Sequence, residues 1–532
     1  MKPGGRPDIL LVSDEDQDPD DHYREVRKFL SAPAEAHPSG FDPAELPHAQ
    51  HLGPAVLGAH LRRHGFEAAV VDNVFRIPRS LELFRAALET GVPAVGISTG
   101  MLRPGSIRRI LKEVRSRTPE ARIILGGETA WRDPSVAALG DVTVIGYGER
   151  ALPQVLQALR DKRGFEGIEN LIIHRAGRLV RTQEDPGLWP EPPLPPAWDL
   201  LESRPSVCYP VEASRGCRHT CLFCTYPALG RRTPKDAEAV LADLAAGLDA
   251  GARLFRFMDS NFTSSPEETE RLCARLARAR LGARWCCYAR PDDLAARPGL
   301  AEELARGGCE AVLMGVDSGD DGILRAMGKG YDSATALEGI RRAKAAGLVT
   351  LSNFIIGFPG ETRESVDRTL EFVSGAGLDI VSFSGFSLRG ASAAWKLRER
   401  LGLEGYGTSW RHGTMDSDES REHVRRAIEA VRSIPGASIG MLHLLVQLLA
   451  YGLEVQEVLV YLGAVKEWHA ARGRPPADAR RRLEEVWERL RSARRRWGAP
   501  APFESSSPAP RASLGALGRL AGSLLRWKSG GA

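Results

Sequence analysis

The 532-residue sequence has no run of about 18 consecutive apolar residues, so it offers no segment that would span a membrane as a helix. It also lacks the apolar core of a signal peptide, because its short polar start leads directly into the strand-like segment Ile9–Val12. We therefore expect a cytoplasmic protein. Neither sign of charge dominates, since 72 Lys and Arg oppose 68 Asp and Glu. This balance argues against a chain built as a whole to bind nucleic acid.

Cysteine is scarce, with eight residues in the whole chain and none before Cys208. So few cysteines in a long chain of this kind indicate metal or redox chemistry and argue against a disulfide framework. Three of them, Cys217, Cys221 and Cys224, have the spacing C-x3-C-x2-C directly after a predicted strand. The other five show no ligand spacing, and we interpret them as small buried hydrophobic residues: Cys208, Cys273, Cys286, Cys287 and Cys309.

The spacing of the three cysteines suits an iron–sulfur cluster. Three thiolates on one loop can each bind a different iron of a cubane, which leaves the fourth iron open to another ligand. The alternative is a zinc site, which usually needs four ligands. His219 could be the fourth, but it lies inside the loop and no second cysteine pair follows. We therefore predict that Cys217, Cys221 and Cys224 are the metal ligands of a [4Fe–4S] cluster.

Residues 1–165 alternate short apolar runs with amphipathic stretches, which predicts a doubly wound, Rossmann-like parallel sheet. Such sheets bind ligands at the carboxyl ends of their strands, and glycine there lets a ligand approach the backbone closely. Any single glycine could instead serve only as a turn. The predicted strands are Ile9–Val12, Ala68–Asp72, Ala94–Ser98, Ile123–Leu125 and Val142–Ile145. The candidate ligand-binding residues at three strand ends are Ser98, Thr99, Gly126, Gly127, Glu128, Gly146, Tyr147, Gly148 and Glu149.

The remainder of the chain divides by composition. Residues 166–206 are predicted to form a hairpin and a proline-rich linker, and residues 207–395 resume the β-α alternation. That alternation has six strands, so we expect a partial (βα)6 barrel with its chemistry at the carboxyl ends of the strands. Residues 396–498 are predicted to be a helical domain. Residues 499–532 are predicted to be a disordered basic tail that could contact an acidic partner or a membrane surface.

The cysteine loop, with Phe223 before its last cysteine, resembles that of the radical SAM superfamily over residues 207–390. The resemblance implies a [4Fe–4S] cluster that takes an electron from an external donor of the flavodoxin or ferredoxin type. The cluster would cleave S-adenosylmethionine (SAM) to give a 5′-deoxyadenosyl radical that abstracts hydrogen from a substrate.

Strand-end motifs in the order typical of that superfamily imply how SAM binds. Its amino group would lie near Asp259 and Asn261, and its carboxylate would bind Arg290. Its adenine would pack near Gly357. Contacts to the ribose or the amino group would come from Asp317 and Ser318, although relatives often have Glu in the place of Asp317.

The N-terminal part resembles the cobalamin-binding domain of B12-dependent radical SAM enzymes, on the glycine-rich strand ends named above. The resemblance implies that those residues contact cobalamin. The motif D-x-H-x-x-G of many cobalamin domains is missing, because Ser13–Asp18 stands in its place. We therefore expect cobalamin to bind without a protein histidine on its lower face.

Taken together, the two resemblances imply a methyltransferase acting on an unactivated carbon, or phosphorus, of a small metabolite, peptide or lipid. The alternative is a cobalamin-dependent cyclase or rearrangement enzyme of the same architecture. A non-catalytic cobalamin protein would not need the cysteine loop. A tRNA methylthiotransferase would carry further cluster cysteines in its N-terminal domain, and this chain has none there. No nucleic-acid partner is expected.

The segment Trp410–Met415 follows the barrel and precedes a helix predicted to start near Asp416. A loop in this place could cover the barrel mouth, and His412 would bring a group that titrates near neutral pH to the substrate. His412 is therefore our candidate catalytic residue. The alternative is that Trp410 holds the C-terminal part on the barrel and His412 is exposed.

Overall fold

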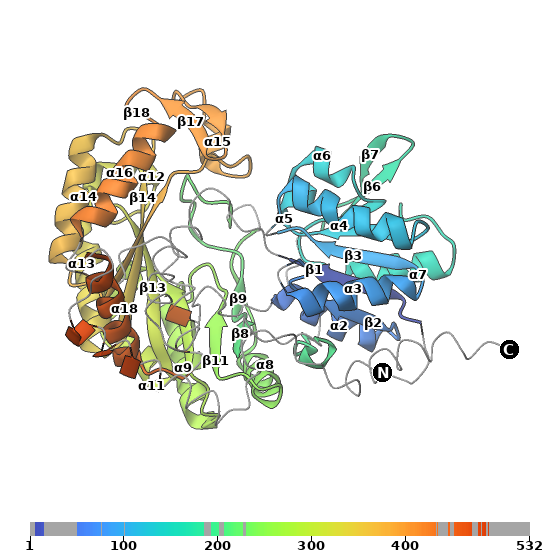
Figure 1. Ribbon diagram of the computed structural model, residues 1–532, viewed down its shortest axis with the longest axis horizontal. Helices are drawn as coiled ribbons and strands as arrows, with labels where there is room; N and C mark the ends of the chain where they lie inside the picture. The colour runs from blue at the N-terminus through green and yellow to red at the C-terminus, as the bar shows by residue number, and fades with distance from the viewer. Residues whose placement is uncertain are drawn as a thin grey trace.

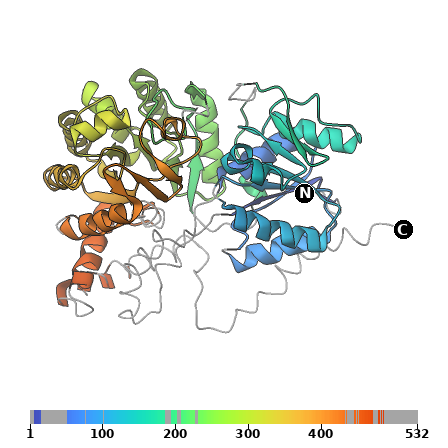
Figure 2. The same cartoon turned by 90° about the horizontal axis from the view of Figure 1, so that it is seen from above.

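The computed structural model describes residues 6–14, 51–185, 193–201, 207–226 and 230–431 almost completely, and parts of 434–488. Two α/β lobes lie side by side, one formed by the chain up to residue 181 and the other by the chain from 207 onward (Figures 1 and 2). Each lobe is built on a sheet of mainly parallel strands, so the predicted α/β class is confirmed. None of the described helices is both long and apolar enough to cross a bilayer.

The N-terminal lobe is a seven-stranded sheet in the order β2-β1-β3-β4-β5-β6-β7. Alternate side chains of β1 are buried on opposite faces, Ile9 and Leu11 on one and Leu10 and Val12 on the other. Both faces therefore need a helical layer. The parallel strands are β1 (Ile9–Ser13), β2 (Ala68–Val71), β3 (Ala94–Ser98), β4 (Arg122–Gly126) and β5 (Val142–Val144). The helices are α2 (Leu52–Arg63), α3 (Pro78–Glu89), α4 (Pro104–Arg117), α5 (Glu128–Arg132), α6 (Pro134–Ala137) and α7 (Ala151–Arg160).

The hairpin of β6 (Leu171–Arg175) and β7 (Arg178–Arg181) extends this sheet, because β6 pairs antiparallel with β5. The hairpin predicted at the start of 166–206 is therefore confirmed, and its strands belong to the sheet of the N-terminal lobe. The apolar start of β6 is buried against the lobe, so the hairpin is held by side-chain packing as well as by strand pairing. Farther along, the short helix η2 (Trp198–Leu200) buries Trp198 against Tyr209 of the next lobe.

The second lobe is a six-stranded parallel sheet in the order β15-β14-β13-β12-β11-β8, which agrees with the predicted partial barrel. Its strands are β8 (Cys208–Val211), β11 (Leu254–Phe257), β12 (Trp285–Ala289), β13 (Cys309–Asp317), β14 (Val349–Ile356) and β15 (Ile380–Gly385). Its helices are α8 (Ala237–Asp249), α9 (Pro266–Ala279), α10 (Pro291–Ala296), α11 (Leu300–Arg306), α12 (Asp321–Met327), α13 (Ser333–Ala345) and α14 (Arg363–Gly375). They pack on one face of the sheet around apolar residues such as Phe255, Phe257 and Trp285.

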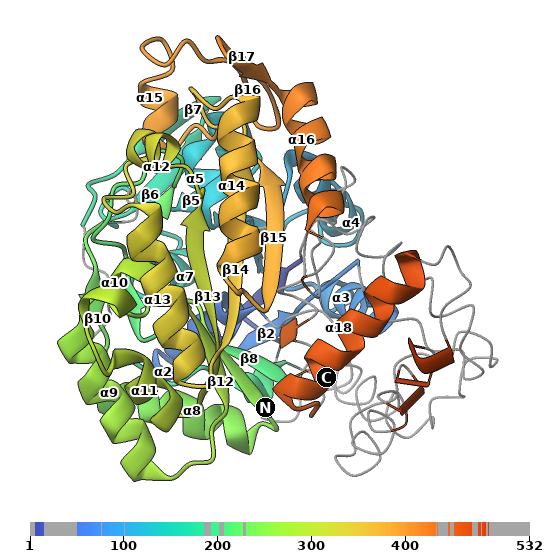
Figure 3. The same cartoon turned by 90° about the vertical axis from the view of Figure 1, so that its left-hand side faces the viewer.

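The chain beyond the barrel is not wholly helical, contrary to the prediction for 396–498. After the short helix α15 (Ala393–Lys396), a three-stranded antiparallel sheet forms from β16 (Glu404–Tyr406), β17 (Ser409–His412) and β18 (Met415–Asp416). Gly407, between β16 and β17, has a φ of 62° and permits the first turn of this sheet, a signal in the sequence that we did not use. Helices α16 (Ser417–Ala430) and α18 (Val455–Ala470) follow, and Figure 3 shows α16 beside β15 and α14.

Candidate active site

The cysteine loop starts beyond the carboxyl end of β8 and lies against the short ladder of β9 (Ser214–Arg215) and β10 (Thr233–Pro234). Gly216 has φ 76°, and a Cβ atom there would lie 2.5 Å from the Arg231 carbonyl oxygen, so the turn into Cys217 requires glycine. The loop is also tied to the end of α12, since the Leu222 amide donates to the Met327 carbonyl at 2.9 Å. The backbone of the loop is therefore fixed by the protein itself.

The three loop cysteines are free thiols that lie near one another, Cys221 buried and Cys217 and Cys224 half-buried. The pKa of Cys224 is raised to about 11, first by burial and further by the neighbouring Cys221 and Cys217. Among the residues that the structure describes, no three His, Cys, Asp or Glu side chains converge tightly enough to hold a single metal ion. Three thiols on one loop suit separate irons of a cubane.

Arg290, predicted to bind the SAM carboxylate, lies at the end of β12 with its Nη1 atom 3.8 Å from the Cys221 sulfur. Its guanidinium also donates to Asp292 at 2.9 Å and 3.0 Å and to the Lys329 carbonyl. The structure thus places a cation against the cysteine loop, as expected, but a carboxylate already accompanies it.

Lys329 is a second cation at this place, and the sequence analysis did not single it out. Its ammonium group donates to the Asp317 carboxylate at 2.5 Å and to the Gly315 carbonyl at 2.7 Å, and both charged side chains are nearly buried. Burial opposes its charge, but the nearby Asp317 carboxylate raises the pKa of Lys329 above its usual value. Asp317 therefore forms an ion pair within the protein, and no pattern in the sequence identified Lys329 as its partner.

The other predicted SAM contacts at the strand ends are buried and bonded within the protein. Asp259 accepts hydrogen bonds from the Ala213 amide at 2.9 Å and the Ser214 hydroxyl at 2.5 Å, and burial raises its pKa to about 6. The Asn261 amide donates to Asp293 at 2.7 Å, and the hydroxyls of Ser318 and Thr369 lie 3.2 Å apart. These contacts fix the rim of the barrel, and a direct contact with SAM stays a prediction for each of them.

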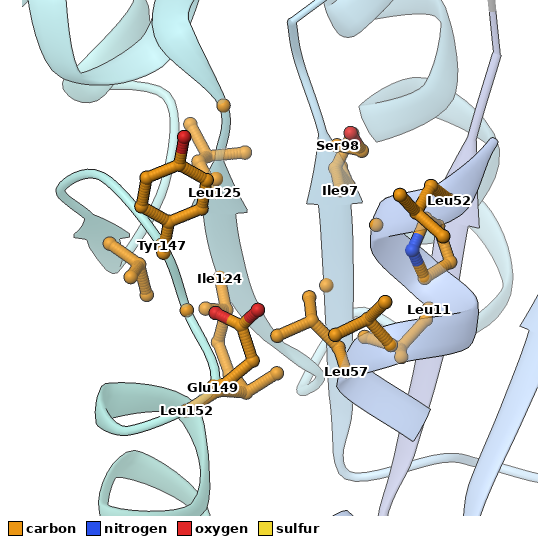
Figure 4. Close-up of a pocket in the computed structure, with 18 of the residues that line it drawn as sticks. Leu11, Leu52, Leu57, Ile97, Ser98, Ile124, Leu125, Tyr147, Glu149 and Leu152 are labelled. Atoms are coloured by element: carbon orange, nitrogen blue, oxygen red, sulfur yellow. The ribbon is translucent and has the colours of Figure 1, made fainter. Parts of the chain in front are cut away.

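A pocket of about 230 Å³ lies at the carboxyl ends of β1, β3, β4 and β5 in the N-terminal lobe (Figure 4). Leu52 and Leu57 of α2 form one side, and Tyr147 and Glu149 lie on the other. Thr99 and Glu128 are not among the residues that line the pocket. Thr99 donates to the Gly126 carbonyl at 2.8 Å, and Glu128 pairs with Arg132 at 3.0 Å. The predicted residues that do line it are Ser98, Gly126, Gly127, Gly146, Tyr147, Gly148 and Glu149.

A histidine lies beside this pocket, although not in the motif for which we searched. His51 directly precedes the pocket-lining Leu52, and its Nδ1 atom contacts the fully buried carboxylate of Asp72. The Ser13 hydroxyl donates to the same carboxylate at 2.8 Å. A lower face of cobalamin free of histidine stays a prediction.

A buried ion pair joins the pocket to the cysteine loop. Arg215, two residues before Cys217, donates to Glu149 of the N-terminal lobe at 2.6 Å, and the two side chains are only 4% and 5% exposed. The guanidinium also pairs with Glu212 at 3.0 Å and lies 4.0 Å from the centre of the Tyr147 ring. Arg215 and Glu212 themselves line the pocket, so its wall contains residues of both lobes.

Two known protein families match this chain, one in each of the two lobes that meet at this ion pair. Residues 48–156 match the B12 binding domain, and residues 211–373 match the radical SAM superfamily. The protein is a radical SAM enzyme with a B12-binding domain. Its cofactors are therefore a [4Fe–4S] cluster, SAM and cobalamin, as the sequence implied.

Named relatives and solved structures agree with this membership. An uncharacterized methyltransferase of Pyrococcus horikoshii is 28% identical over 349 residues, which are 63% of this chain and 75% of the relative. The methyltransferase TsrM from Kitasatospora setae, solved with cobalamin and a [4Fe–4S] cluster, has a TM-score of 0.63 at 17% identity and covers 91% of this chain and 99% of its own. The cobalamin-dependent enzyme OxsB, solved with aqua-cobalamin and SAM, has a TM-score of 0.64 at 14% identity. The match covers 92% of this chain and 84% of the OxsB chain. At these identities the two structures show a shared fold.

The pocket of this radical SAM enzyme fits part of a corrinoid. A Cβ atom added at Gly126 or Gly146 would meet no other atom within 4 Å, so both glycines leave open space where a side chain would project. Most of the neighbouring walls are apolar, as expected for a site that holds a bulky organic cofactor. A corrinoid is larger than this pocket, so the rest of it would lie outside.

His412 lies on β17 and not in a flexible loop. Its Nε2 atom is 3.1 Å from the Gly357 carbonyl oxygen, and its ring stacks on Trp410 at 5.1 Å with an interplanar angle of 4°. Trp410 is buried and donates from its indole to the Phe386 carbonyl at 2.7 Å. These contacts favour the anchoring alternative for Trp410, and a catalytic role for His412 stays a prediction.

We expect His412→Ala to destabilise the radical SAM enzyme by about 1–2 kcal/mol, because it removes one hydrogen bond and one ring stack. The cluster should stay intact, and 5′-deoxyadenosine formation should fall only a few-fold. Urea unfolding and product quantification measure the two effects. Complete loss of SAM cleavage with unchanged stability would instead assign His412 a direct chemical role.

Glu361 makes the same turn sensitive to pH. Its buried carboxyl accepts from the Gly357 amide, and burial raises its pKa from 4.5 to about 7. The folded protein therefore keeps this proton where the unfolded chain has lost it, and stability falls as the pH rises from 4.5 to 7. Glu361→Gln should flatten this part of the stability–pH curve, whereas Glu371→Gln on the exposed side of α14 should not. Superimposable curves for wild type and Glu361→Gln would refute the assignment.

Proposed function

We propose that this radical SAM enzyme transfers a methyl group to an unactivated carbon, or phosphorus, of a small metabolite, peptide or lipid. When bound, the cluster and SAM supply a radical that removes hydrogen from such a centre, and cobalamin supplies a methyl carrier. Methyl transfer needs both at one substrate atom. The observation that carries the proposal is the buried Arg215–Glu149 pair, because it holds the wall of the cobalamin pocket two residues from the first cluster cysteine.

The roles of the chain's own residues follow from their places. Cys217, Cys221 and Cys224 bind the cluster. Arg290 and Lys329 bring two cations to the cysteine loop, which suits the carboxylate of SAM. The rim residues Asp259, Asn261, Asp317, Ser318 and Gly357 shape the SAM site, and the pocket-lining residues of the N-terminal lobe contact cobalamin.

Partners and location complete the proposal. The cluster takes its electron from a flavodoxin- or ferredoxin-type donor, and no nucleic acid takes part. All eight cysteines are free thiols in the structure, a state that the reducing cytoplasm preserves. We propose a cytoplasmic protein on that ground. A membrane contact of the basic tail concerns residues 499–532, which lie outside the described part of the chain.

The fate of the methyl group of SAM tests the proposal. The reconstituted protein with cobalamin and a reductant should convert SAM to both S-adenosylhomocysteine and 5′-deoxyadenosine, because a methyltransferase of this kind uses SAM in two ways. A cobalamin-dependent cyclase or rearrangement enzyme would form 5′-deoxyadenosine without S-adenosylhomocysteine. Mass spectrometry with SAM carrying a deuterated methyl group distinguishes the two. Absence of S-adenosylhomocysteine would overturn the methyltransferase proposal in favour of the alternative.

A further inference from the structure

Arg256 on β11 lies on the face of the barrel sheet that the helices leave uncovered. Its neighbours Phe255 and Phe257 belong to the apolar core under the helices, and the ring of Phe257 is 5.0 Å from that of Trp285. Because side chains alternate along a strand, Arg256 points to the opposite face. Its guanidinium there donates to the Tyr288 hydroxyl and lies 5.3 Å from the centre of that ring.

Among the residues that the structure describes, no Asp or Glu forms an ion pair with this cation; the ionisable groups nearest to it are Tyr288, Cys286 and Cys208. Its Nε atom is shielded from solvent and has no hydrogen-bond partner in the structure. An arginine stays charged under all ordinary conditions. Arg256 is partly buried, and a partly buried charge without a counterion is costly, so proteins retain such groups where a ligand supplies the missing charge.

The position of Arg256 relates it to the cofactor sites. It lies three residues before Asp259, which follows the end of β11, so it is about 10 Å below the rim of the barrel at the rise of an extended chain. Tyr288 lies on β12, two residues before Arg290, whose guanidinium is 3.8 Å from the Cys221 sulfur. The Arg256 guanidinium therefore lies on the same side of the sheet as the end of the cysteine loop.

We propose that Arg256, assisted by the Tyr288 hydroxyl, binds an oxyanion of the substrate, either a carboxylate or a phosphate group. The planar guanidinium offers paired donors that match the two oxygens of such a group. The inference rests on the proposed function and narrows its substrate class. The substrate carries an acidic group roughly 10 Å from the barrel rim, along the direction of the strands. Neutral hydrocarbons are thereby excluded as substrates.

The test measures oxyanion binding to the holoprotein, carrying its cluster and cobalamin. Sodium acetate and inorganic phosphate are titrated separately at constant ionic strength with sodium chloride, and the thermal midpoint is followed. A ligand that binds only the folded protein raises this midpoint. We expect a rise with at least one of the two anions, and the more effective anion identifies the acidic group as carboxylate or phosphate.

Three variants make the result specific. Arg256→Met should abolish the rise while leaving the anion-free midpoint equal or higher, because it removes an unpaired cation and keeps the apolar volume. Arg256→Lys keeps the charge without the paired donors and should weaken binding at least ten-fold. Arg278→Gln, on the exposed side of α9, should behave as wild type. Arg256→Lys provides a second, milder test of anion binding that does not depend on the stability of Arg256→Met.

Three outcomes would overturn the proposal. They are no rise in the wild type with either anion, an undiminished rise in Arg256→Met or Arg256→Lys, and an anion-free midpoint of Arg256→Met well below wild type. The last would show that Arg256 serves the fold through Tyr288 alone. None of these readouts depends on S-adenosylhomocysteine, so oxyanion binding and methyl transfer can fail independently.

Discussion

Cys221→Ala protein, reconstituted with iron and sulfide, should hold little iron and form no detectable 5′-deoxyadenosine. Cys221 is the buried member of the three loop cysteines, and the Arg290 guanidinium lies 3.8 Å from its sulfur. A cubane held by three thiolates has no spare protein ligand, so removal of one leaves two irons without protein support. Iron analysis, the visible absorption of the cluster and product quantification measure the effect, and we expect at least a 100-fold loss of turnover.

Cys273→Ala is the matched control for this prediction. Cys273 is a buried cysteine of α9 that packs in the apolar core, and its replacement should cost stability but leave iron content and SAM cleavage near wild type. A Cys221→Ala protein with full iron content and normal SAM cleavage would refute the cluster assignment.

Gly126→Leu should abolish cobalamin binding without unfolding the protein. Gly126 ends β4 at the pocket, and a Cβ atom there would meet no other atom within 4 Å, so the backbone and its neighbours accept a side chain. The leucine would then occupy the space that the cofactor needs. We expect at least 100-fold weaker binding of hydroxocobalamin, measured by its visible absorption after gel filtration. Formation of 5′-deoxyadenosine should persist, because the cysteine loop belongs to the other lobe.

Gly105→Leu provides the comparison for Gly126→Leu. Gly105 is exposed on α4, and a Cβ atom there also meets nothing within 4 Å, but it does not line the pocket. This variant should bind cobalamin as wild type does. Stoichiometric cobalamin in Gly126→Leu would show that the cofactor lies elsewhere in the protein.

Local patterns in the sequence predicted the parts of the site that lie on single strands and loops. The cysteine loop and the glycine-rich ends of β3, β4 and β5 could be found because short spacing and β-α alternation are properties of contiguous residues. The three-stranded sheet at 404–416 was missed because its strands are too short to give a periodic pattern. The glycines at its turn were not used as evidence for a hairpin.

The charged pairs of the site could not be found in this way. Arg215 and Glu149 are separated by 66 positions, and only the packing of two lobes brings them together. Lys329 reaches Asp317 from a loop after α12, where nothing in the sequence distinguishes it from an exposed lysine. The absence of a carboxylate beside Arg256 among the described residues is equally invisible in the sequence, because it depends on which side chains the fold brings to that face of the sheet.

The Arg215–Glu149 pair limits how this protein can be recombined with its relatives. A chimera that takes its N-terminal lobe from one parent and its barrel from another joins two surfaces that each carry half of a buried pair. If the lobe from the second parent lacks the residue of opposite charge, the remaining buried charge has no partner. Such an unpaired charge costs about 3–5 kcal/mol, a large share of the stability of a typical domain. Exchange of lobes should therefore succeed only between parents that share both residues, or when Tyr147, Glu149, Glu212 and Arg215 are moved as one unit.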